Sequence, residues 1–440
     1  MWIYFWWLPC FLLVFSAPAY GEPQQAGATL TLDQAVSLAL ANNSAIRQAS
    51  ESLASSRENA KAVRDQNLPR FSTSYAYTSR EDNPYAIFNG TKVLVGARDD
   101  FAWDLTLDQP IFTGFALSAK TRMAELGVKI SEVDRQLAIL DLTERVRLAY
   151  YRIFQQKQLL QVAEDTVTQL AAHEKDASQF FDQGLIPYND LLKSQVALST
   201  AKQDRLQARS EVEMAVARLN TLLRLPMEQP TEIVDPNATP GSLPDLAPLV
   251  KEAKTNRPES RALQFALDKS EQLVRLAKSS YYPEVNLEGR YVRNGEDPAA
   301  TNNDYANDHN ASIGVKATWT FFEWGRKRAQ VNSRLHAHDA MAAQLEQLKD
   351  TIGLQVKQSW LHLKVSLANI ETSEEARKQA EENFRITRLQ YQKSLATSSD
   401  VLDARTMLSQ AEANASNNVY GCLSARAELD RAVGRGLKNE

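Results

Sequence analysis

The residues whose types and spacing suggest a chemical role lie in one short stretch near the end of the chain. Asp400 and Asp403 are one helical turn apart, and Tyr391 precedes them at the end of a long helical pattern. Neighbouring carboxylates attract cations and repel anions. A plainer interpretation is a helix N-terminus, where Ser399 caps the helix and Asp400 complements its dipole. The two interpretations are compatible, so the stretch predicts an electrostatic site at the start of a helix.

The sequence contains no set of residues that suggests catalysis or a bound metal. The closest pair among the five histidines, His336 and His338, is two positions apart and therefore lies off a common helical face. The six methionines form no cluster with each other or with cysteine, so the soft ligands of a copper or silver site are not assembled. The sequence therefore predicts neither an enzyme nor a cofactor or metal site.

Composition and the first residues indicate an exported protein without a nucleic-acid partner. The net charge is −4 with 24% charged residues, which leaves no basic footprint for nucleic acid. An apolar run followed by small residues predicts a signal peptide over residues 1–21, cleaved after Ala19 or Gly21, although no Lys or Arg precedes Arg47. Beyond it, no stretch approaches the roughly 18 apolar residues of a transmembrane helix. We expect cleavage to remove Cys10, so that an intrachain disulfide is excluded.

The stretch that carries the two aspartates occurs twice. Residues 391–403 resemble residues 181–193, with Asp190 at the position of Asp400. A period of this length in a chain of 440 residues indicates two tandem copies of one large unit, not a solenoid of short repeats. We expect the mature chain to form one structural unit made of a first repeat over residues 22–230, a proline-rich linker over 231–248 and a second repeat over 249–440.

Each repeat contains two stretches in which apolar and polar residues alternate. The alternation predicts strands at about residues 70–79, 100–111, 284–293 and 311–322. Each is about the length of a tilted strand that crosses a bilayer, and the charges on the polar faces would suit a water-filled lumen. An ordinary half-buried antiparallel sheet shows the same alternation. Four strands are too few to close a membrane barrel, so membrane-spanning strands would be pooled, and three chains would supply twelve.

Helical patterns of unusual length surround the strands. The mature chain opens with an amphipathic helix that Thr31 is expected to cap, and helical composition continues to about Gln66. The equivalent helical segment of the second repeat is interrupted at Pro258. The proline-free pattern from residue 115 to residue 181 would extend about 100 Å as one helix. The returning helices carry heptad seams of mostly small residues, and we interpret Cys422 on the second seam as a buried core residue.

In their order, spacing and duplication these features resemble the TolC-like outer membrane efflux proteins of Gram-negative bacteria. The resemblance covers about residues 30–437. It is carried by Leu32-Asp-Gln-Ala-Val-Ser-Leu-Ala-Leu-Ala-Asn-Asn43, by the strand ends Pro110-Ile-Phe-Thr-Gly114 and Phe321-Phe-Glu-Trp-Gly325, and by the turn Ser399-Asp-Val-Leu-Asp-Ala404. It implies a mainly α-helical fold with transmembrane β-strands, in which three protomers form a twelve-stranded β-barrel that continues into a periplasmic α-helical tunnel.

The resemblance assigns a gate to the second hairpin turn. In the family, two aspartates one helical turn apart line the tunnel where it narrows at its periplasmic tip, and they match Asp400 and Asp403. A tyrosine of the bonding network around this gate matches Tyr391. Six carboxylates from three chains would repel anions, attract cations and raise some of one another's pKa values. A basic residue that the family often has in this turn is replaced here by Ala396.

The resemblance also assigns partners. The tips of both hairpins resemble the contact sites for the hairpin tips of a periplasmic adaptor protein, and the matching residues are Gly184, Leu185, Ser394 and Leu395. The function implied is a passive exit duct in the outer membrane, surrounded by its lipid. It would serve an inner-membrane pump of the RND or ABC type in tripartite efflux or type I secretion, with drugs, metals, solvents or polypeptides as cargo. The alternative from another class is a periplasmic coiled-coil scaffold without channel activity.

Overall fold

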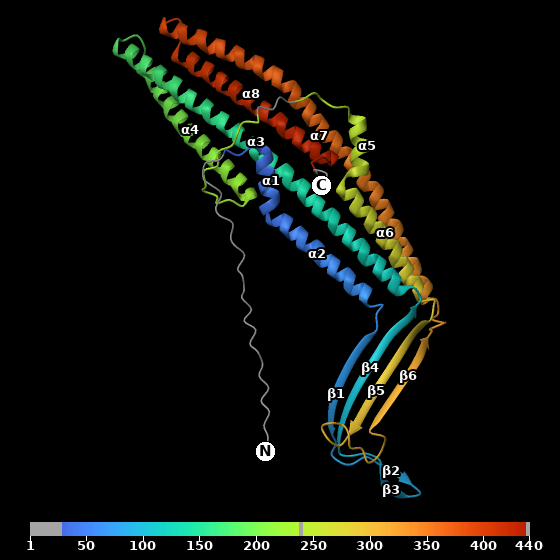
Figure 1. The fold of residues 1–440 in the computed structure, drawn as a ribbon. Coiled ribbons are helices and arrows are strands. Elements are labelled where there is room, and N and C mark those ends of the chain that lie inside the picture. The colour runs from blue at the N-terminus through green and yellow to red at the C-terminus, as the bar shows by residue number, and fades with distance from the viewer. Residues whose placement is uncertain (1–28, 237–240, 437–440) are drawn as a thin grey trace, which may run out of the picture.

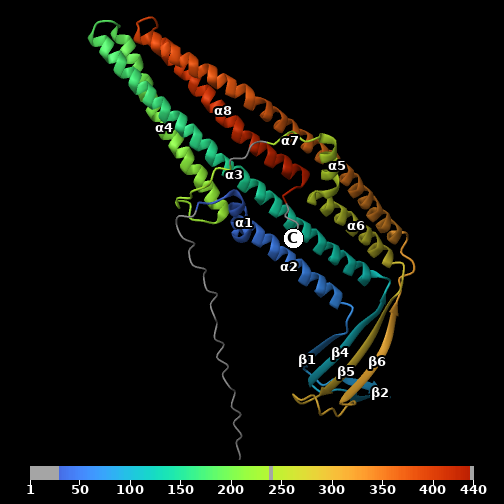
Figure 2. The same cartoon turned by 45° about the horizontal axis from the view of Figure 1, so that its top comes forward.

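The structure, a computed structural model, describes residues 29–236 and 241–436. The signal peptide expected over residues 1–21 lies outside the described residues. The chain forms an elongated molecule, with a four-stranded sheet at one end and the tips of two long helical hairpins at the other (Figure 1). Two pairs of shorter helices lie along the hairpins between these ends, as the turned view in Figure 2 also shows.

The sheet is antiparallel, and its strand order is β1-β4-β5-β6. The strands are β1 (Arg70–Ser79), β4 (Asp99–Thr113), β5 (Glu284–Gly295) and β6 (His309–Thr318), and a small hairpin of β2 (Tyr85–Phe88) and β3 (Thr91–Leu94) lies between β1 and β4. The prediction that the fourth strand continues to residue 322 was wrong. Thr318 pairs with Glu284, the first residue of β5, so the residues beyond it have no strand to pair with. Pro283 precedes Glu284 and lacks the N–H that would extend the ladder.

The register gives the sheet one apolar and one polar face. One row across the four strands consists of Phe71, Leu107, Gly289 and Ile313. On the opposite face, Arg290 Nε donates to Asp104 Oδ1 at 2.7 Å, and Lys316 pairs with Glu288 at 3.5 Å. The alternation in all four strands is thus in phase, which is what a sheet between an apolar and an aqueous medium requires.

The two outer strands of the sheet are open edges. Every residue of β1 and β6 is exposed, and neither strand pairs with another on its outer side within the described residues. Apolar side chains on these strands are exposed as well, with Phe71 at 69% and Ile313 at 75%. Long, exposed edges with apolar side chains are sites at which strands of another chain add.

The two long hairpins have the same dimensions. α3 (Ala116–Asp182) and α7 (Arg326–Gln392) each contain 67 residues, and α4 (Tyr188–Leu223) and α8 (Ser398–Val433) each contain 36. At about 1.5 Å per residue, α3 and α7 each extend about 100 Å, as the proline-free pattern predicted. None of the helices in the described part of the chain is both long and apolar enough to cross a bilayer. The repeat seen in the sequence is therefore a repeat of whole helices.

The shorter helices form one pair in each repeat. They are α1 (Leu32–Asn42) and α2 (Ser44–Asp65), and α5 (Leu246–Asn256) and α6 (Pro258–Ser279). Thr31 caps α1 in a reciprocal capping box with Gln34, which confirms the expected cap. Helix continues to Asp65 with Gln66 as its C-cap, as predicted, but the chain breaks at Asn43, which the sequence analysis did not mark. The extended backbone of Asn43 ends α1, and its side chain accepts a hydrogen bond from the Ala45 amide at the start of α2.

The returning helices of the two hairpins differ in burial. α8 packs against α7 and α3, and the residues of its seam, including Val401, Leu408 and Cys422, are mostly buried. Cys422 is a fully buried free thiol, as predicted. α4 packs mainly against α3, and its seam is interrupted by the exposed Arg205. Together with the exposed Leu206, this gives α4 a face without a partner among the described residues.

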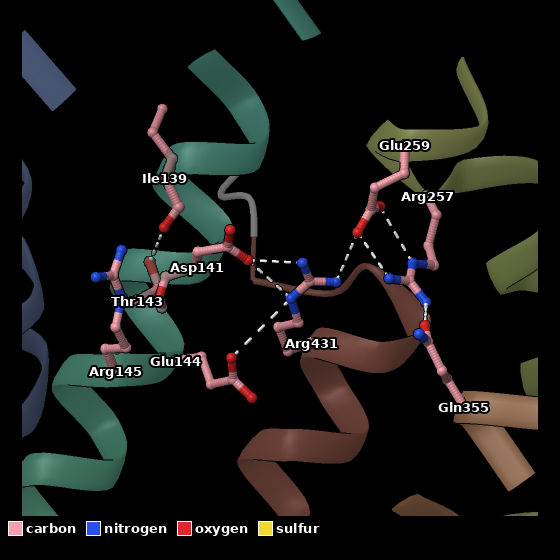
Figure 3. A network of polar contacts seen from close by, with 9 residues as sticks. All are labelled: Ile139, Asp141, Thr143, Glu144, Arg145, Arg257, Glu259, Gln355 and Arg431. Carbon is pink, nitrogen blue, oxygen red and sulfur yellow. Dashed lines mark hydrogen bonds and ion pairs between the residues drawn. The ribbon is translucent and has the colours of Figure 1, made fainter. Parts of the chain in front are cut away.

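A polar network in the middle of the molecule joins four helices (Figure 3). Arg431 of α8 pairs with Asp141 of α3 at 2.6 Å and with Glu259 of α6 at 2.9 Å. Arg257, which precedes α6, pairs with the same Glu259 at 2.6 Å and donates to Gln355 of α7 at 2.6 Å. These charge-assisted hydrogen bonds fix the long helices to the shorter ones.

Glu259 contributes to this network in its ionised form. Burial opposes its ionisation, but hydrogen bonds from Arg257 and the charges of Arg257 and Arg431 outweigh burial and lower the pKa of Glu259 to about 2. Because the folded-state pKa lies below the ordinary value of 4.5, this contribution to stability is complete above about pH 4.5 and is lost as the pH falls towards 2.

Arg431→Met is expected to lower the free energy of unfolding by about 3 kcal/mol, because it leaves three neighbouring carboxylates without their shared cation. Denaturant unfolding followed by the helical circular dichroism signal measures this change. The matched control is Arg209→Met, which removes an exposed pair with Glu213 and is expected to cost no more than about 0.5 kcal/mol. Equal losses in the two variants would show that the network does not stabilise the helices.

Candidate functional site

The two hairpin turns lie side by side at the end of the molecule opposite the sheet (Figures 1 and 2). Gly184 and Ser394 occupy equivalent positions, and both have left-handed backbones, with φ of +72° and +58°. In each turn the next amide reaches back across the helix end, from Leu185 to the Phe180 carbonyl and from Leu395 to the Gln390 carbonyl, both at 2.8 Å. The two turns therefore share one backbone form, although serine pays a steric cost in this conformation that glycine does not.

Each turn presents a leucine to solvent. Leu185 is 58% exposed and Leu395 is 75% exposed. A Cβ added at Gly184 would meet nothing within 4 Å, so the surface around the first tip is open. In both turns, an exposed leucine thus follows the residue with the left-handed backbone, Gly184 in the first turn and Ser394 in the second.

Asp400 and Asp403 both lie on the first turns of α8 with their side chains exposed. The prediction that Ser399 caps this helix was wrong, because Thr397 does. The Thr397 hydroxyl accepts from the Asp400 amide, and the Asp400 carboxylate accepts from the Thr397 amide at 2.8 Å and from its hydroxyl at 2.7 Å. These bonds lower the pKa of Asp400 within one chain, so mutual repulsion among aspartates would have to come from other copies. Asp403 forms no hydrogen bond or ion pair with any described residue.

Tyr391 lies in the interior of the hairpin end, not on its surface. It is 2% exposed, and its ring contacts the rings of Phe180 and His173. Its hydroxyl has no hydrogen-bond partner among the described residues, and burial raises its pKa. The bonding network expected around Tyr391 is therefore not made through its hydroxyl in this chain, and the residue acts as an aromatic packing element.

A buried polar link between the two hairpins is made by His173, which the sequence analysis did not single out. His173 of α3 is 3% exposed, and a hydrogen bond of 2.9 Å joins its Nε2 to Ser398 Oγ at the start of α8. Burial lowers the pKa of His173, the charge of Asp176 opposes this, and that of Arg388 adds to it. The imidazole is thus kept neutral, and its hydrogen bond to Ser398 joins the first hairpin to the second.

A second missed residue is Lys193, the counterpart of Asp403 in the first repeat. Its Nζ lies 3.3 Å from Asp190 Oδ1 and 3.3 Å from Ser399 Oγ, so it bridges α4 and the start of α8. Lys193 thus places a positive charge close to the first residues of α8, next to the turn in which Ala396 stands in place of a basic residue. Sequence spacing could place His173 and Lys193 on their helices, but only the packing of the two hairpins brings them to α8.

Comparisons with known proteins agree with this geometry. Residues 35–223 and 249–435 match the family described as Outer membrane efflux protein. Outer membrane protein TolC of Escherichia coli (strain K12) is 20% identical over 330 residues, which span 72% of this chain and 66% of that relative, somewhat less than two thirds of its length.

Solved structures of outer-membrane channels have the same fold. The outer membrane protein VceC from Vibrio cholerae has a TM-score of 0.79 at 17% identity, and the match covers 92% of this chain and 97% of that one. The CmeC outer membrane channel from Campylobacter jejuni has a TM-score of 0.77 at 16% identity, with 94% and 90% covered. At such identities the structures show the fold alone, whereas the family match covers both repeats. The chain belongs to the outer membrane efflux protein family and is located in the outer membrane, with its helices extending into the periplasm.

Proposed function

We propose that the protein is the outer-membrane exit duct of a tripartite efflux or type I secretion system. The observation that carries the proposal is the sheet, which has one apolar face, one charged face and two open edges, and which leads directly into helices of about 100 Å. The apolar face would contact lipid, and the charged face would line water. The long helices would form the wall of a tunnel that extends from the sheet across the periplasm towards a pump.

Three copies would complete the duct. β6 of one chain would pair with β1 of the next, which satisfies both open edges and gives twelve strands from three sets of four. The helices support the same ring, because the two outer helices of the protomer expose apolar residues that a neighbour would cover. These include Leu206 on α4, and Leu354 and Val365 on α7.

The gate would lie at the periplasmic end of α8. In a ring of three chains, Asp400 and Asp403 would contribute six carboxylates around the axis, where they would favour cations and hold back anions. His173, Ser398 and Lys193 would keep each α8 against the first hairpin of its own chain, in the closed position. Tyr391 would fill the space behind this contact.

The tips would be the docking sites for a periplasmic adaptor protein. Leu185 and Leu395 project from turns with the same backbone form, so both could insert between the hairpin tips of a partner in the same way. The adaptor would connect the duct to an inner-membrane pump of the RND or ABC type, and the pump would select the cargo.

Planar-bilayer recording tests the duct and its gate together. Wild-type protein is expected to form cation-selective channels, and Asp403→Asn is expected to lower their cation selectivity and weaken block by a multivalent cation about tenfold, because half of the carboxylates lose their charge. Thr397→Ala is the matched control, since it removes the helix cap but leaves every carboxylate in place. A soluble monomer without conductance would contradict the duct, and unchanged block in Asp403→Asn would contradict the gate.

The closed position is expected to weaken in acid. Because the pKa of buried His173 lies below its ordinary value of 6.5, the opened state binds the proton more tightly, and the free energy of opening falls as the pH drops below about 6.5. One such group changes this free energy by at most about 1.4 kcal/mol per pH unit. Hydrogen exchange over residues 391–400, corrected for intrinsic rates, should therefore lose protection between pH 7 and 5.5. His173→Gln keeps a hydrogen-bonding group without the titration and should abolish the loss; the same loss in both proteins would exclude His173 as its cause.

Docking is tested by changing the two exposed leucines. Leu185→Asp with Leu395→Asp is expected to reduce efflux to the level of cells without the protein, because a charge at each tip would be desolvated on contact with the adaptor. Trimers and their conductance should be retained. The control, Leu185→Met with Leu395→Met, conserves volume and should keep efflux. Normal efflux in the aspartate variant would exclude the tips as docking sites.

A further inference from the structure

A cavity of about 730 Å³ opens where the sheet meets the helices. It lies between the start of α3 and the end of α6, beside Gly114. A Cβ at Gly114 would lie 2.6 Å from the Ser279 carbonyl oxygen, so the chain leaving β4 passes very close to the end of α6. Gly114 and Ser279 therefore close the cavity on the side next to the sheet.

Aromatic residues line the side of the cavity that borders the sheet. The rim of the cavity carries Phe115 and Tyr282, whose ring centroids are 5.7 Å apart. Both rings also contact Phe112, which pairs with Val285 on the apolar face of the sheet. The rim is therefore continuous with the face that would contact lipid. Aromatic rings at this level are typical of the membrane–water interface.

Charges in the cavity are ordered by their depth below that interface. Lys278 and Arg275 lie nearest the sheet on α6, and Arg122 lines the cavity from α3, where it pairs with Glu125 at 3.1 Å. Glu271 and Asp268 follow on α6, about 6 and 10 Å from Arg275 along the helix axis. Arg275 pairs with Glu271 at 2.9 Å, and Asp268 accepts a hydrogen bond from Gln264 at 3.2 Å. Lys278 forms no ion pair with any described residue. The cavity thus offers cations near the bilayer and acids one turn further from it.

The floor of the cavity contains a polar side chain without a partner. Gln272 is 8% exposed, lines the cavity, and forms no hydrogen bond with the described residues. Its amide atoms are not among the side-chain atoms that are closed off from solvent, so they are open to a ligand or to water in the cavity. Near the sheet, α3 and α6 lie between α2 and α7, so a second copy is not expected to fill the space.

We propose that this cavity binds the phosphoethanolamine headgroup of a phospholipid from the inner leaflet of the outer membrane. The phosphate would be held by Lys278, with Arg275 and Arg122 turning to it from their exposed pairs with Glu271 and Glu125. The ammonium would be held by Glu271 and Asp268, with Gln272 hydrogen-bonded to the headgroup. The two ends of this zwitterion are separated by a two-carbon spacer, which suits charges that alternate from one helical turn to the next. Phe115 and Tyr282 would contact the start of the acyl chains. The inference rests on the proposed placement of the sheet in the bilayer.

Native mass spectrometry of delipidated trimers tests the site. The trimers are titrated with phosphatidylethanolamine or phosphatidylglycerol of the same acyl chains, and the first lipid is expected to bind more tightly, up to one per chain. Arg122→Gln with Lys278→Gln should weaken both lipids by about tenfold or more, because both carry the phosphate. Asp268→Asn should weaken phosphatidylethanolamine alone, since only that lipid carries the ammonium.

The control is Lys175→Gln, which removes an exposed charge from α3 close to the hairpin tips and should leave binding unchanged. Conductance of each variant shows whether it has folded. Trimers that conduct but bind neither lipid would overturn the site and leave the duct intact. Trimers that bind the lipid but do not conduct would overturn the duct and leave the site intact. Equal binding of the two lipids, or equal loss of both in Asp268→Asn, would overturn the zwitterionic headgroup.

Discussion

Backbone N–H and C=O groups along the outer sides of β1 and β6 find no partner strand within the described chain, and in a bilayer each unpaired group would cost several kcal/mol. This constraint determines much of the remaining structure. If the strands contact lipid, they must pair with strands of other copies. The rotation that relates the copies would then fix where each helix that follows a strand begins. α3 and α7 are such helices, and because each is about 100 Å long, the same rotation would also fix the positions of the hairpin tips.

The two repeats of the chain have hairpins with the same backbone structure, but many of their equivalent side chains differ. The two hairpins have helices of equal length and turns of the same form, even though Ser394 replaces the glycine of the first turn. Their surroundings differ, because α8 is packed between two long helices whereas α4 has an unpartnered face. α8, whose seam is mostly buried, is also the helix with the two aspartates. Two hairpins of the same dimensions thus carry side chains with different surroundings.

Much of the fold follows from local patterns, whereas the contacts at the site do not. Alternation predicted the four strands of the sheet, and the absence of proline predicted a helix of about 100 Å, whereas the common phase of the strands comes from their pairing. The break at Asn43 was missed because a single capping side chain caused it, without a proline. The cap at Thr397 was assigned to Ser399, since both are hydroxyl residues within one turn. His173 and Ser398 are 225 positions apart, and only tertiary packing joins them.

The proposed gate depends on a balance between two kinds of charge. Asp400 already serves the start of α8, because its carboxylate completes the cap and so stays ionised inside one chain. Asp403 has no such partner, so its charge would act mainly on ions and on the other copies. The contacts that oppose repulsion among the copies are a neutral histidine and a lysine from the first hairpin, not a basic residue at position 396. Acid would therefore weaken one of the buried contacts that hold the start of α8 in the closed position.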